Sequence, residues 1–331
     1  MTIEDVARRA GVSIATVSRV LNGTANVSPK TEKKVRDAVK ACNYHANMLG
    51  SGLRSRTTKT VLCIISTMVN SFYAKIIRGI EDVAEKNGYR VLIGTNYDSA
   101  EREDSYLTLV RNHLADGVIL MRPSISHDAL IELANAFPVV QCDCPADGME
   151  IPSVYIDNRA AAREMTTKII EAGHRRIALL CARDGYNVAE ERYHGFLEAM
   201  ESHGLSVPEN RILNGNYGWR NAKTVVGAYL ETEIPDAIFC LSDRMAAGAM
   251  AAIRETGLSV PKDVSVVGFD NIDLAHMTEP PLTTVSQNQY NMGSLCMEKL
   301  LYMIRSGKRP ESSVIPHEII WRESVALREK N

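Results

Sequence analysis

The sequence has no run of apolar residues long enough to cross a membrane, since a transmembrane helix needs roughly 20 of them. Its acidic, non-periodic first residues show no pattern of a secretory signal peptide. These two absences argue against a membrane protein and against an exported one. We therefore expect a cytoplasmic protein that has no membrane partner.

The seven cysteines are odd in number and scattered, and no cluster of cysteine and histidine completes the four ligands of a zinc site. One residue separates Cys142 from Cys144, which is not the spacing of a zinc or redox pair. His174 lies in a Gly-His-Arg-Arg segment that is typical of a helix-to-strand turn. We expect structural thiols, no metal and no cofactor. The cysteines are Cys42, Cys63, Cys142, Cys144, Cys181, Cys240 and Cys296.

The fingerprints of nucleotide-binding and hydrolytic enzymes are also missing. There is no Gly-x-Gly-x-x-Gly motif, no phosphate-binding loop ending in Gly-Lys-Ser or Gly-Lys-Thr, and no Gly-x-Ser-x-Gly elbow. Residues 215–218 are glycine-rich, but their spacing does not suit a phosphate and predicts a turn. These absences weigh against catalysis.

What the sequence does contain begins with two short helices around a glycine turn. Thr2 with Asp5 forms a capping-box signature, and apolar residues then repeat at helical spacing to about Ala10. Gly11 gives the backbone freedom for a sharp turn, and Ser13 is a suitable N-cap for the second helix. The pattern is typical of a helix-turn-helix motif, in which the N-terminal part of the second helix contacts base edges in the major groove of DNA.

The second helix separates an apolar face, formed by Val17, Val20 and Leu21, from a polar one. Residues 1–56 carry ten Lys and Arg against four Asp and Glu, a charge of +6, so the remaining chain carries −8 to give the total of −2. An amphipathic hairpin with a solvated polar face is the alternative. The concentration of positive charge favours contact with phosphates. The residues expected to contact DNA are Ile14, Ala15, Thr16, Ser18, Arg19 and Asn22.

The rest of the chain, about 275 residues, is long enough for two sizeable cores. Short apolar runs such as 61–65 and 177–180 alternate with longer helical stretches such as 72–87 and 158–172. This alternation predicts parallel sheets that are covered by helices on both faces.

Residues 10–23 and a series of later motifs resemble the LacI/GalR family of bacterial transcriptional regulators. The order and spacing of the motifs make the resemblance specific, and it covers the whole chain. It implies an all-α helix-turn-helix DNA-binding head and an α/β core of two doubly wound lobes, similar to type I periplasmic binding proteins, with three crossovers and a ligand between the lobes. The later motifs are residues 27–31, 79–81, 116–120, 157–158, 173–177, 242–246, 267–271 and 281–285.

The resemblance also implies limits for each part of the chain. The head is expected at 1–45, the hinge helix or linker at 46–59, and the effector-binding and dimerisation core at 60–331. Within the core, the expected N-lobe is 60–157 with 287–315, and the C-lobe is 158–286 with 316–331.

In the family, the hinge forms a helix in the minor groove of DNA. The resemblance therefore implies DNA contacts by Asn47 and by Leu53, whose side chain wedges into a base step. Gly50 and Gly52 are expected to make this helix reluctant to form without DNA, because each glycine costs roughly 1 kcal/mol against alanine in a helix interior. Taken alone, the segment resembles an ordinary flexible basic linker.

Matching to family ligand positions implies an effector site of aromatic, acidic, arginine and amide side chains. Such a set suits a polyhydroxylated small molecule, because aromatic faces cover apolar ring surfaces and the polar groups bind hydroxyls. We expect a sugar, a sugar derivative or a nucleoside; Tyr186, at the position of a base-contacting arginine in purine-responsive relatives, disfavours a purine. The site residues implied are Phe72, Tyr73, Asp143, Arg192, Tyr217, Ser242, Asp270 and Gln287.

Together these features predict an effector-controlled, DNA-binding transcriptional regulator, most simply a repressor, without catalytic activity. Residues 322–331 show no leucine heptads, so we expect a homodimer on an approximately palindromic operator in double-stranded DNA. One alternative is a DNA-processing enzyme with a helix-turn-helix head, for which no catalytic cluster is visible. A transport binding protein is another, but it has no use for such a head.

Overall fold

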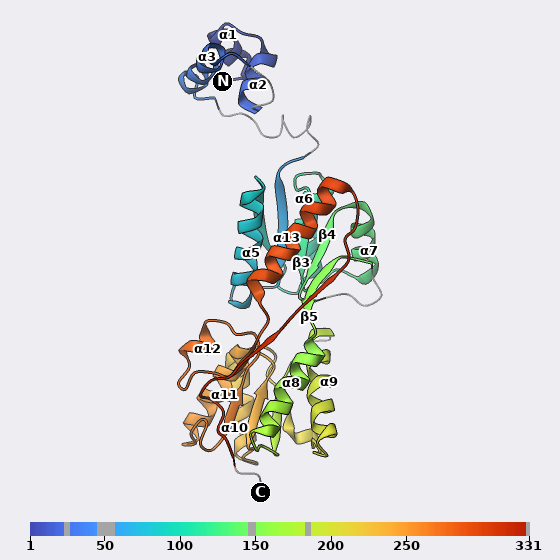
Figure 1. Cartoon of the computed structure of the whole chain (residues 1–331), viewed down its shortest axis with the longest axis vertical. Helices are drawn as coiled ribbons and strands as arrows, with labels where there is room; N and C mark the ends of the chain where they lie inside the picture. The colour runs from blue at the N-terminus through green and yellow to red at the C-terminus, as the bar shows by residue number, and fades with distance from the viewer. Residues whose placement is uncertain (23–26, 45–56, 145–149, 183–186, 329–331) are drawn as a thin grey trace. The chain divides into compact units, whose positions relative to one another are not determined.

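The computed structural model describes residues 1–22, 27–44, 57–144, 150–182 and 187–328. The chain divides into two compact units, Met1–Thr58 and Lys59–Asn331. We call them the head and the core unit, and each is described by itself (Figure 1). No helix in the described ranges is long and apolar enough to span a bilayer.

The head consists of α1 (Ile3–Ala10), α2 (Ile14–Asn22) and α3 (Pro29–Ala41). The predicted capping box is confirmed, because Thr2 and Asp5 each accept a hydrogen bond from the backbone N–H of the other. Gly11 ends α1 with a φ of 65°, a left-handed conformation that glycine adopts at little cost. The Ser13 hydroxyl accepts from Thr16 N at 3.2 Å, as expected of an N-cap.

A small apolar core joins the three helices of the head. Val6 of α1, Val17 of α2 and Val35 of α3 are all fully buried in one cluster. Val20 is buried as predicted, whereas Leu21 is only partly buried and packs at the margin of the cluster. The buried side of α2 is therefore narrower than the sequence pattern suggested.

The first lobe of the core unit is built on a parallel sheet with the strand order β11-β5-β4-β3-β1-β2. Helices α5 and α13 cover one face of it, and α6 and α7 cover the other (Figure 1). Its strands are β1 (Thr60–Ile65), β2 (Arg90–Thr95), β3 (Val118–Met121), β4 (Val139–Cys142), β5 (Ser153–Ile156) and β11 (Ser313–Ile315). Its helices are α5 (Phe72–Lys86), α6 (Ala100–Arg111), α7 (His127–Ala136) and α13 (Gln289–Ser306).

Strand β1 explains why the predicted apolar runs are continuous. Val61, Cys63 and Ile65 lie in the cluster with α5 and α13, while Leu62 and Ile64 lie in the cluster with α6 and α7. Side chains alternate between the two faces of a strand, so both faces must be apolar when helices cover each.

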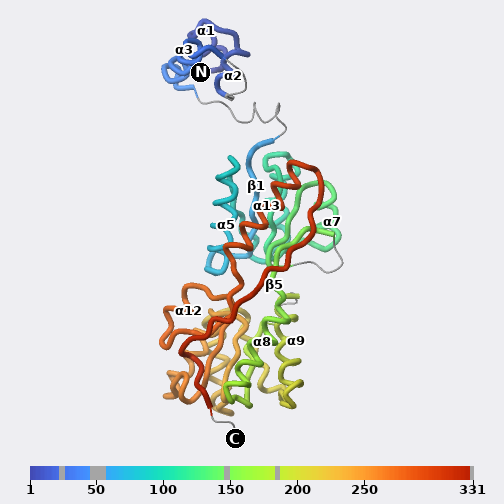
Figure 2. Tube along the Cα trace, viewed as in Figure 1, coloured from blue at the N-terminus to red at the C-terminus, as the bar shows by residue number. Residues whose placement is uncertain are grey.

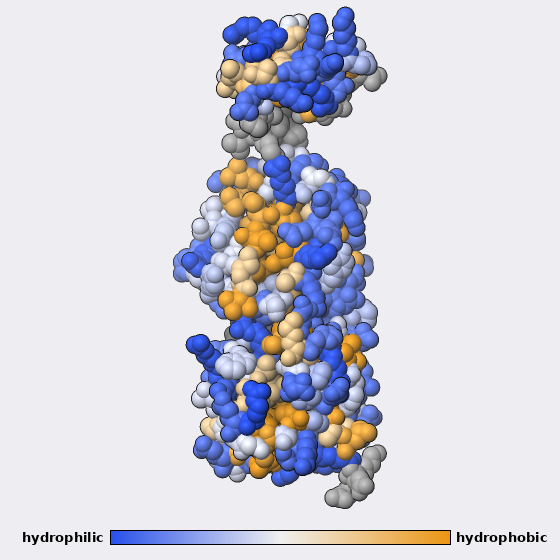
Figure 3. Space-filling view, turned by 90° about the vertical axis from the view of Figure 1, so that its left-hand side faces the viewer, coloured by the Kyte–Doolittle hydropathy of each residue, from blue (hydrophilic) through white to orange (hydrophobic). Residues whose placement is uncertain are grey.

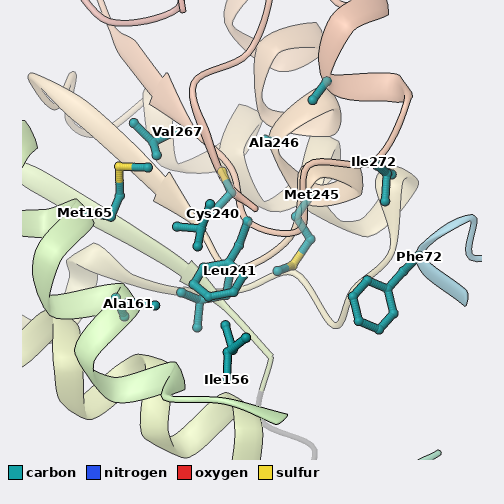
Figure 4. Packing of buried hydrophobic residues seen from close by; sticks show 14 of the residues in the cluster. Phe72, Ile156, Ala161, Met165, Cys240, Leu241, Met245, Ala246, Val267 and Ile272 are labelled. Carbon is teal, nitrogen blue, oxygen red and sulfur yellow. The ribbon is translucent and has the colours of Figure 1, made fainter. Parts of the chain in front are cut away.

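The second lobe carries a parallel sheet of order β7-β6-β8-β9. Helices α8 and α9 pack together on one side of it, and α10 and α11 on the other (Figure 1). Cys240, Met245 and Val267 belong to its core (Figure 4). Its elements are α8 (Asn158–Glu171), β6 (Ile177–Cys181), α9 (Asn187–Ser202), the 3₁₀ turn η1 (Glu209–Arg211), β7 (Ile212–Asn214), α10 (Trp219–Leu230), β8 (Ala237–Cys240), α11 (Asp243–Glu255), β9 (Ser265–Val267) and α12 (Leu274–Met277).

The chain passes between the lobes after β5, before α13 and after β11, as Figure 2 shows. The last two passages flank the antiparallel pair of β10 (Thr284–Ser286) and β12 (Glu318–Ile320). Within the first lobe, α13 crosses α5 so closely that a Cβ at Gly293 would collide with the carbonyl of Ile76. Glycine is required at this crossing.

Turn and cysteine predictions agree with the structure. The segment 215–218 is a turn in which Gly218 N donates to Gly215 O at 3.0 Å. Its central residues, Asn216 and Tyr217, have φ values of 45° and 53°, as in a type I′ turn. His174 is buried between α8 and β6 with its Nε2 2.9 Å from Ala326 O, a structural role. The seven cysteines carry free thiols, and Cys144 alone among them is only partly buried.

Candidate functional site

The outer face of α2 carries the predicted DNA contacts. Ile14, Ala15 and Arg19 are exposed, and Ile14 is 44 % exposed despite its apolar side chain. Thr16 and Ser18 are half-buried. Arg19 makes no hydrogen bond or ion pair with any described residue of the head. An exposed isoleucine and an unengaged arginine on one short helix are suited to contact a surface outside the chain.

Some of the predicted DNA contacts cannot be placed. Asn47 and Leu53 lie outside the described residues, as do Gly50 and Gly52, and the side chain of Asn22 is likewise outside what is described. The hinge is therefore a feature of the sequence alone.

The core unit contains a cavity of about 300 Å³ between its two lobes. Part of the wall is formed by residues that follow strands of both sheets, such as Arg122 directly after β3, Asp143 directly after β4 and Tyr217 in the turn after β7. Ligands of open α/β sheets bind at the carboxyl ends of parallel strands. The lining residues are Ser66, Thr67, Asn70, Phe72, Tyr73, Asp98, Met121, Arg122, Asp143, Cys144, Val188, Arg192, Asn216, Tyr217, Gly218, Arg244 and Asp270.

The backbone is strained around this cavity. Arg122, Asp143 and Asp270 have φ values of 58°, 70° and 119°, and Asp98 also has a positive φ. Each such conformation costs of order 1–3 kcal/mol for a residue other than glycine, and residues of this kind cluster at functional sites. The strain aims polar side chains at the cavity from the ends of the strands.

Arg192 of α9 is held by several contacts within the site. It is 3 % exposed; its Nε donates to Asn158 Oδ1 at 2.8 Å, and Nη1 donates to Leu241 O at 2.9 Å. Nη1 lies 3.7 Å from Asp270 Oδ1, and the guanidinium stacks 3.8 Å above the Phe269 ring. Arg192 is therefore fixed in orientation before any ligand arrives.

Asp270 faces Arg192 from the loop that follows β9. Its Oδ1 accepts from Gln287 Nε2 at 2.7 Å, and its carbonyl accepts from the Gln289 side chain. Burial raises the pKa of the Asp270 carboxyl well above its ordinary value, and Arg192 opposes this shift. Gln287 and Gln289 precede and begin α13, so Asp270 joins the second lobe to a crossover segment.

Asp143 provides a carboxylate of the first lobe. Its Oδ1 is buried and has no hydrogen-bond partner among the described residues. Burial raises the pKa of Asp143, while Arg192 and Arg122 lower it. A buried oxygen without a donor is destabilising, and a ligand hydroxyl or N–H would satisfy it.

Aromatic side chains complete the wall. Phe72 and Tyr73 begin α5 with their rings in an edge contact at 5.4 Å, and the hydroxyl groups of Tyr73 and Ser66 lie 2.8 Å apart. Phe72 belongs to the same buried cluster as Met245 and Ile272 of the second lobe (Figure 4). These rings offer apolar faces beside the charged groups.

Beneath the cavity, Asp243 at the start of α11 ties two segments of the second lobe together. Its carboxylate accepts from Ile272 N at 2.8 Å and from the Thr284 hydroxyl at 2.5 Å. Burial raises the pKa of Asp243 to about 7, although these hydrogen bonds and Arg322 oppose the shift. Asp243 thereby holds the loop of Asp270 against β10.

The structure brings most of the predicted effector residues together. Phe72, Tyr73, Asp143, Arg192, Tyr217 and Asp270 line the cavity. Gln287 lies behind Asp270 and holds it. Ser242 is the N-cap of α11, its hydroxyl accepting from Met245 N at 3.2 Å, and it is not among the described lining residues. Tyr186 lies outside the described residues.

Sequence reasoning missed several lining residues, notably Asp98, Arg122, Asn216 and Arg244. Their signal was available, because Arg122 directly follows the apolar run 118–121. Among the described residues, no group of three or more His, Cys, Asp or Glu could hold a metal ion.

Comparisons with known proteins cover both parts of the chain. Residues 2–47 match the family described as bacterial regulatory proteins, lacI family, and residues 166–325 match the periplasmic binding protein-like domain. Catabolite control protein A of Priestia megaterium is 37% identical over 98% of this chain and 99% of its own. The HTH-type transcriptional repressor CytR of Escherichia coli K12 is 35% identical over 91% of this chain and 89% of its own.

Solved structures agree. The lac repressor dimer bound to operator and the anti-inducer ONPF has a TM-score of 0.89 at 26% identity, covering 98% of this chain and 99% of its own. The transcriptional regulator CelR in complex with cellobiose has a TM-score of 0.74 at 30% identity, with the same coverage.

Proposed function

Because the chain belongs to the LacI family of bacterial transcriptional regulators, we propose that it is a cytoplasmic repressor whose operator affinity is controlled by a small hydroxylated effector. The relatives that match it along almost its whole length are transcriptional regulators. Like them, the protein is a DNA-binding transcriptional regulator and not an enzyme. The observation that carries the proposal is that one chain contains both an exposed α2 face, in the head, and a polar cavity, in the core unit.

The DNA-contacting surface that we propose is the N-terminal part of α2. Arg19 can donate two hydrogen bonds to a guanine edge, while Ile14 and Ala15 can contact a thymine methyl group. Thr16, Ser18 and Asn22 complete the surface. For the limits of the two DNA-binding parts we propose those implied by the family, with the head at 1–45 and the hinge at 46–59. Asn47 and Leu53 of the hinge would contact the minor groove.

The assembly that we propose is a homodimer on an approximately palindromic operator. The matching lac repressor structure is a dimer on its operator. Leu92, Tyr290 and Tyr302 of the core unit are exposed, and apolar residues gather in patches on the face seen in Figure 3. Burying such surface against a second copy is favourable. Light scattering at micromolar concentration is expected to give a dimer; a tetramer would contradict the proposal.

The cavity favours a sugar, a sugar derivative or a nucleoside as the effector. Its volume of about 300 Å³ is at the small end of ligand pockets. Asp143, Arg192 and Asp270 offer acceptors and donors for hydroxyls, and the rings of Phe72 and Tyr73 offer apolar contact. The matched CelR structure contains cellobiose, which supports a ligand of the sugar type.

The effector would act by joining the two lobes. Asp143 belongs to the first lobe and Arg192 to the second, so one ligand bound to both favours their approach. Asp270 is linked through Gln287 and Gln289 to the start of α13, which packs on α5 in the first lobe. Allosteric coupling of this kind is typically about 1–3 kcal/mol, or about 5- to 150-fold in operator affinity.

A thermal-shift panel of D-ribose, D-glucose, D-fructose, cellobiose, cytidine and adenosine tests the effector class. A compound at a hundred times its Kd stabilises the native state by about 2.7 kcal/mol, which raises the Tm by roughly 5–10 °C for a unit of this size. The active compound is then added to the protein on DNA obtained by binding selection. A Tm increase without any change in DNA affinity would contradict the regulatory role.

A further inference from the structure

Glu103 of α6 is a buried carboxylate that neither DNA binding nor the effector contacts proposed for the cavity use. It is fully buried, and its Oε2 accepts from Asn96 Nδ2 and from Ser124 N, both at 2.7 Å. Its Oε1 has no partner among the described residues. Burying a carboxylate is costly unless hydrogen bonds and an opposite charge compensate it.

The two groups that Glu103 holds belong to two cavity loops. Asn96 begins the turn after β2, and its Oδ1 accepts from Asp98 N at 3.1 Å. Its Nδ2 also donates to the carbonyl of Arg122 at 3.3 Å, and Ser124 lies two residues further along the same loop. One carboxylate therefore ties the turn 96–98 to the loop 122–124.

Both loops hold residues in the left-handed region. Asp98 and Arg122 have φ values of 57° and 58°. Such conformations persist only where the surroundings over-determine them. The hydrogen bonds of Asn96 and Glu103 supply that constraint. They therefore fix the backbone positions from which the side chains of Asp98 and Arg122 extend.

Asp98 and Arg122 line the cavity from the first lobe, with Arg122 Nε 3.4 Å from Asp98 Oδ1. The guanidinium of Arg122 also lies 5.8 Å from the ring centre of Tyr217, which belongs to the second lobe. Arg122 therefore lines the cavity at a point where residues of both lobes lie close together. Neither Asp98 nor Arg122 is among the residues implied by the family ligand positions.

We propose that Asp98 and Arg122 are a further ligand-binding pair of this cavity and that Glu103 is the positioning residue that presents them. The proposal rests on the proposed function and narrows its ligand class. The lining carries the guanidinium groups of Arg122, Arg192 and Arg244 beside the carboxyl groups of Asp98, Asp143 and Asp270. A neutral, hydroxyl-rich molecule uses both kinds of group without adding charge to the cavity, and the pair binds it with guanidinium donors and carboxylate acceptors.

Hydrogen exchange on the ligand-free protein tests the positioning role. Glu103→Met is close in size to the parent residue and removes the Oε2 acceptor that both donors share. We expect exchange at Ser124 N and in residues 96–98 to rise at least tenfold, with the second lobe unchanged. Asp104→Asn is the matched control, because Asp104 is the next residue on α6 and pairs with Arg111 in solvent. Equal exchange in the two variants would overturn the positioning role.

Binding of the same sugars and nucleosides tests the ligand contact. Arg122→Gln is expected to weaken the active compound at least tenfold, and Arg111→Gln, which removes a solvent-exposed guanidinium of α6, is expected to leave it unchanged. Glu103→Met is also expected to weaken binding, and it should weaken binding less in the Arg122→Gln variant than in the parent, because part of its effect acts through Arg122. Additive losses would mean that Glu103 acts generally on the fold, and unchanged binding in Arg122→Gln would overturn the ligand role.

The two proposals fail in different ways. If no neutral compound raises the Tm of the parent protein, a neutral hydroxylated ligand is wrong both for this pair and for the proposed function. The exchange result on the ligand-free protein still decides whether Glu103 positions the two loops. A different outcome is that anionic sugars bind, and that Arg122→Gln binds them as tightly as the parent. This outcome would overturn the preference of the cavity for a neutral ligand and leave the DNA-binding function untouched.

Discussion

Replacing Arg192 by methionine is the sharpest test of how the cavity is built. The side chain is buried between Asn158, Leu241 and Asp270, and it stacks on Phe269. Methionine keeps much of the apolar stem but removes every donor. Asp270, which is only 5 % exposed, then faces the cavity without its cation.

The expected loss follows from these contacts. Removing one member of a buried ion pair costs about 3–5 kcal/mol, because the other charge stays buried without compensation. Since 1 kcal/mol shifts the Tm of a unit of this size by about 2–4 °C, we expect the Tm to fall by roughly 6–20 °C. Adding Asp270→Asn to Arg192→Met should recover about 1 kcal/mol or more, because it removes the uncompensated carboxylate.

Tryptophan fluorescence during urea unfolding measures this loss in the core unit, since Trp219 and Trp321, the two tryptophans of the chain, both lie there. Arg111→Met is the control, because the Arg111–Asp104 pair is exposed and such pairs contribute about 0–1 kcal/mol. A loss for Arg192→Met no larger than that of the control would refute the reasoning. So would a double variant that is less stable than Arg192→Met alone.

Further predictions concern the head, the pH dependence and the helices of the second lobe. Arg19→Ala should weaken operator binding by about 1–3 kcal/mol and relax the preference at one base pair per half-site; binding selection that returns the parental site with unchanged preference would exclude α2 as the specificity helix. Burial raises the native pKa of Asp243 from 3.8 to about 7, so the stability contributed by its protonation is present below pH 3.8 and lost as the pH rises through 7. The unfolding free energy of Asp243→Asn, measured in urea, should therefore fall less between pH 4 and 8 than that of the parent, and parallel curves would contradict the shift. Gly227→Ala, where a methyl group meets open space within α10, should stabilise the core unit by about 0.4–1 kcal/mol, whereas Gly248→Ala should destabilise it because the methyl group would collide with the carbonyl of Trp219; thermal unfolding of the two variants distinguishes these signs.

Local structure was predictable because it depends on neighbours in the chain. The capping box at Thr2, the left-handed Gly11 and the apolar strand 60–65 need only short-range pattern and the demand that buried faces be apolar. The family pattern likewise pointed to Phe72 and Asp143 before their surroundings were known. These residues could be named in advance, but their neighbours across the cavity could not.

Ser242 illustrates the limit of position matching. Its place before an acidic residue and an apolar run is equally the signature of an N-cap, and in the structure its hydroxyl caps α11. The same residue type serves both purposes, so pattern alone does not separate a ligand contact from a helix cap.

Only the tertiary structure decided which polar groups meet. Asp98 and Glu103 come from the unit of β2 and α6, whereas Arg122 follows β3 and Asp143 follows β4. Parallel strands bring those ends to one edge of a sheet, whatever their distance along the chain. The left-handed backbone at Arg122 and the hydrogen bonds of Glu103 depend on that meeting, because a local sequence cannot specify a partner that another strand supplies.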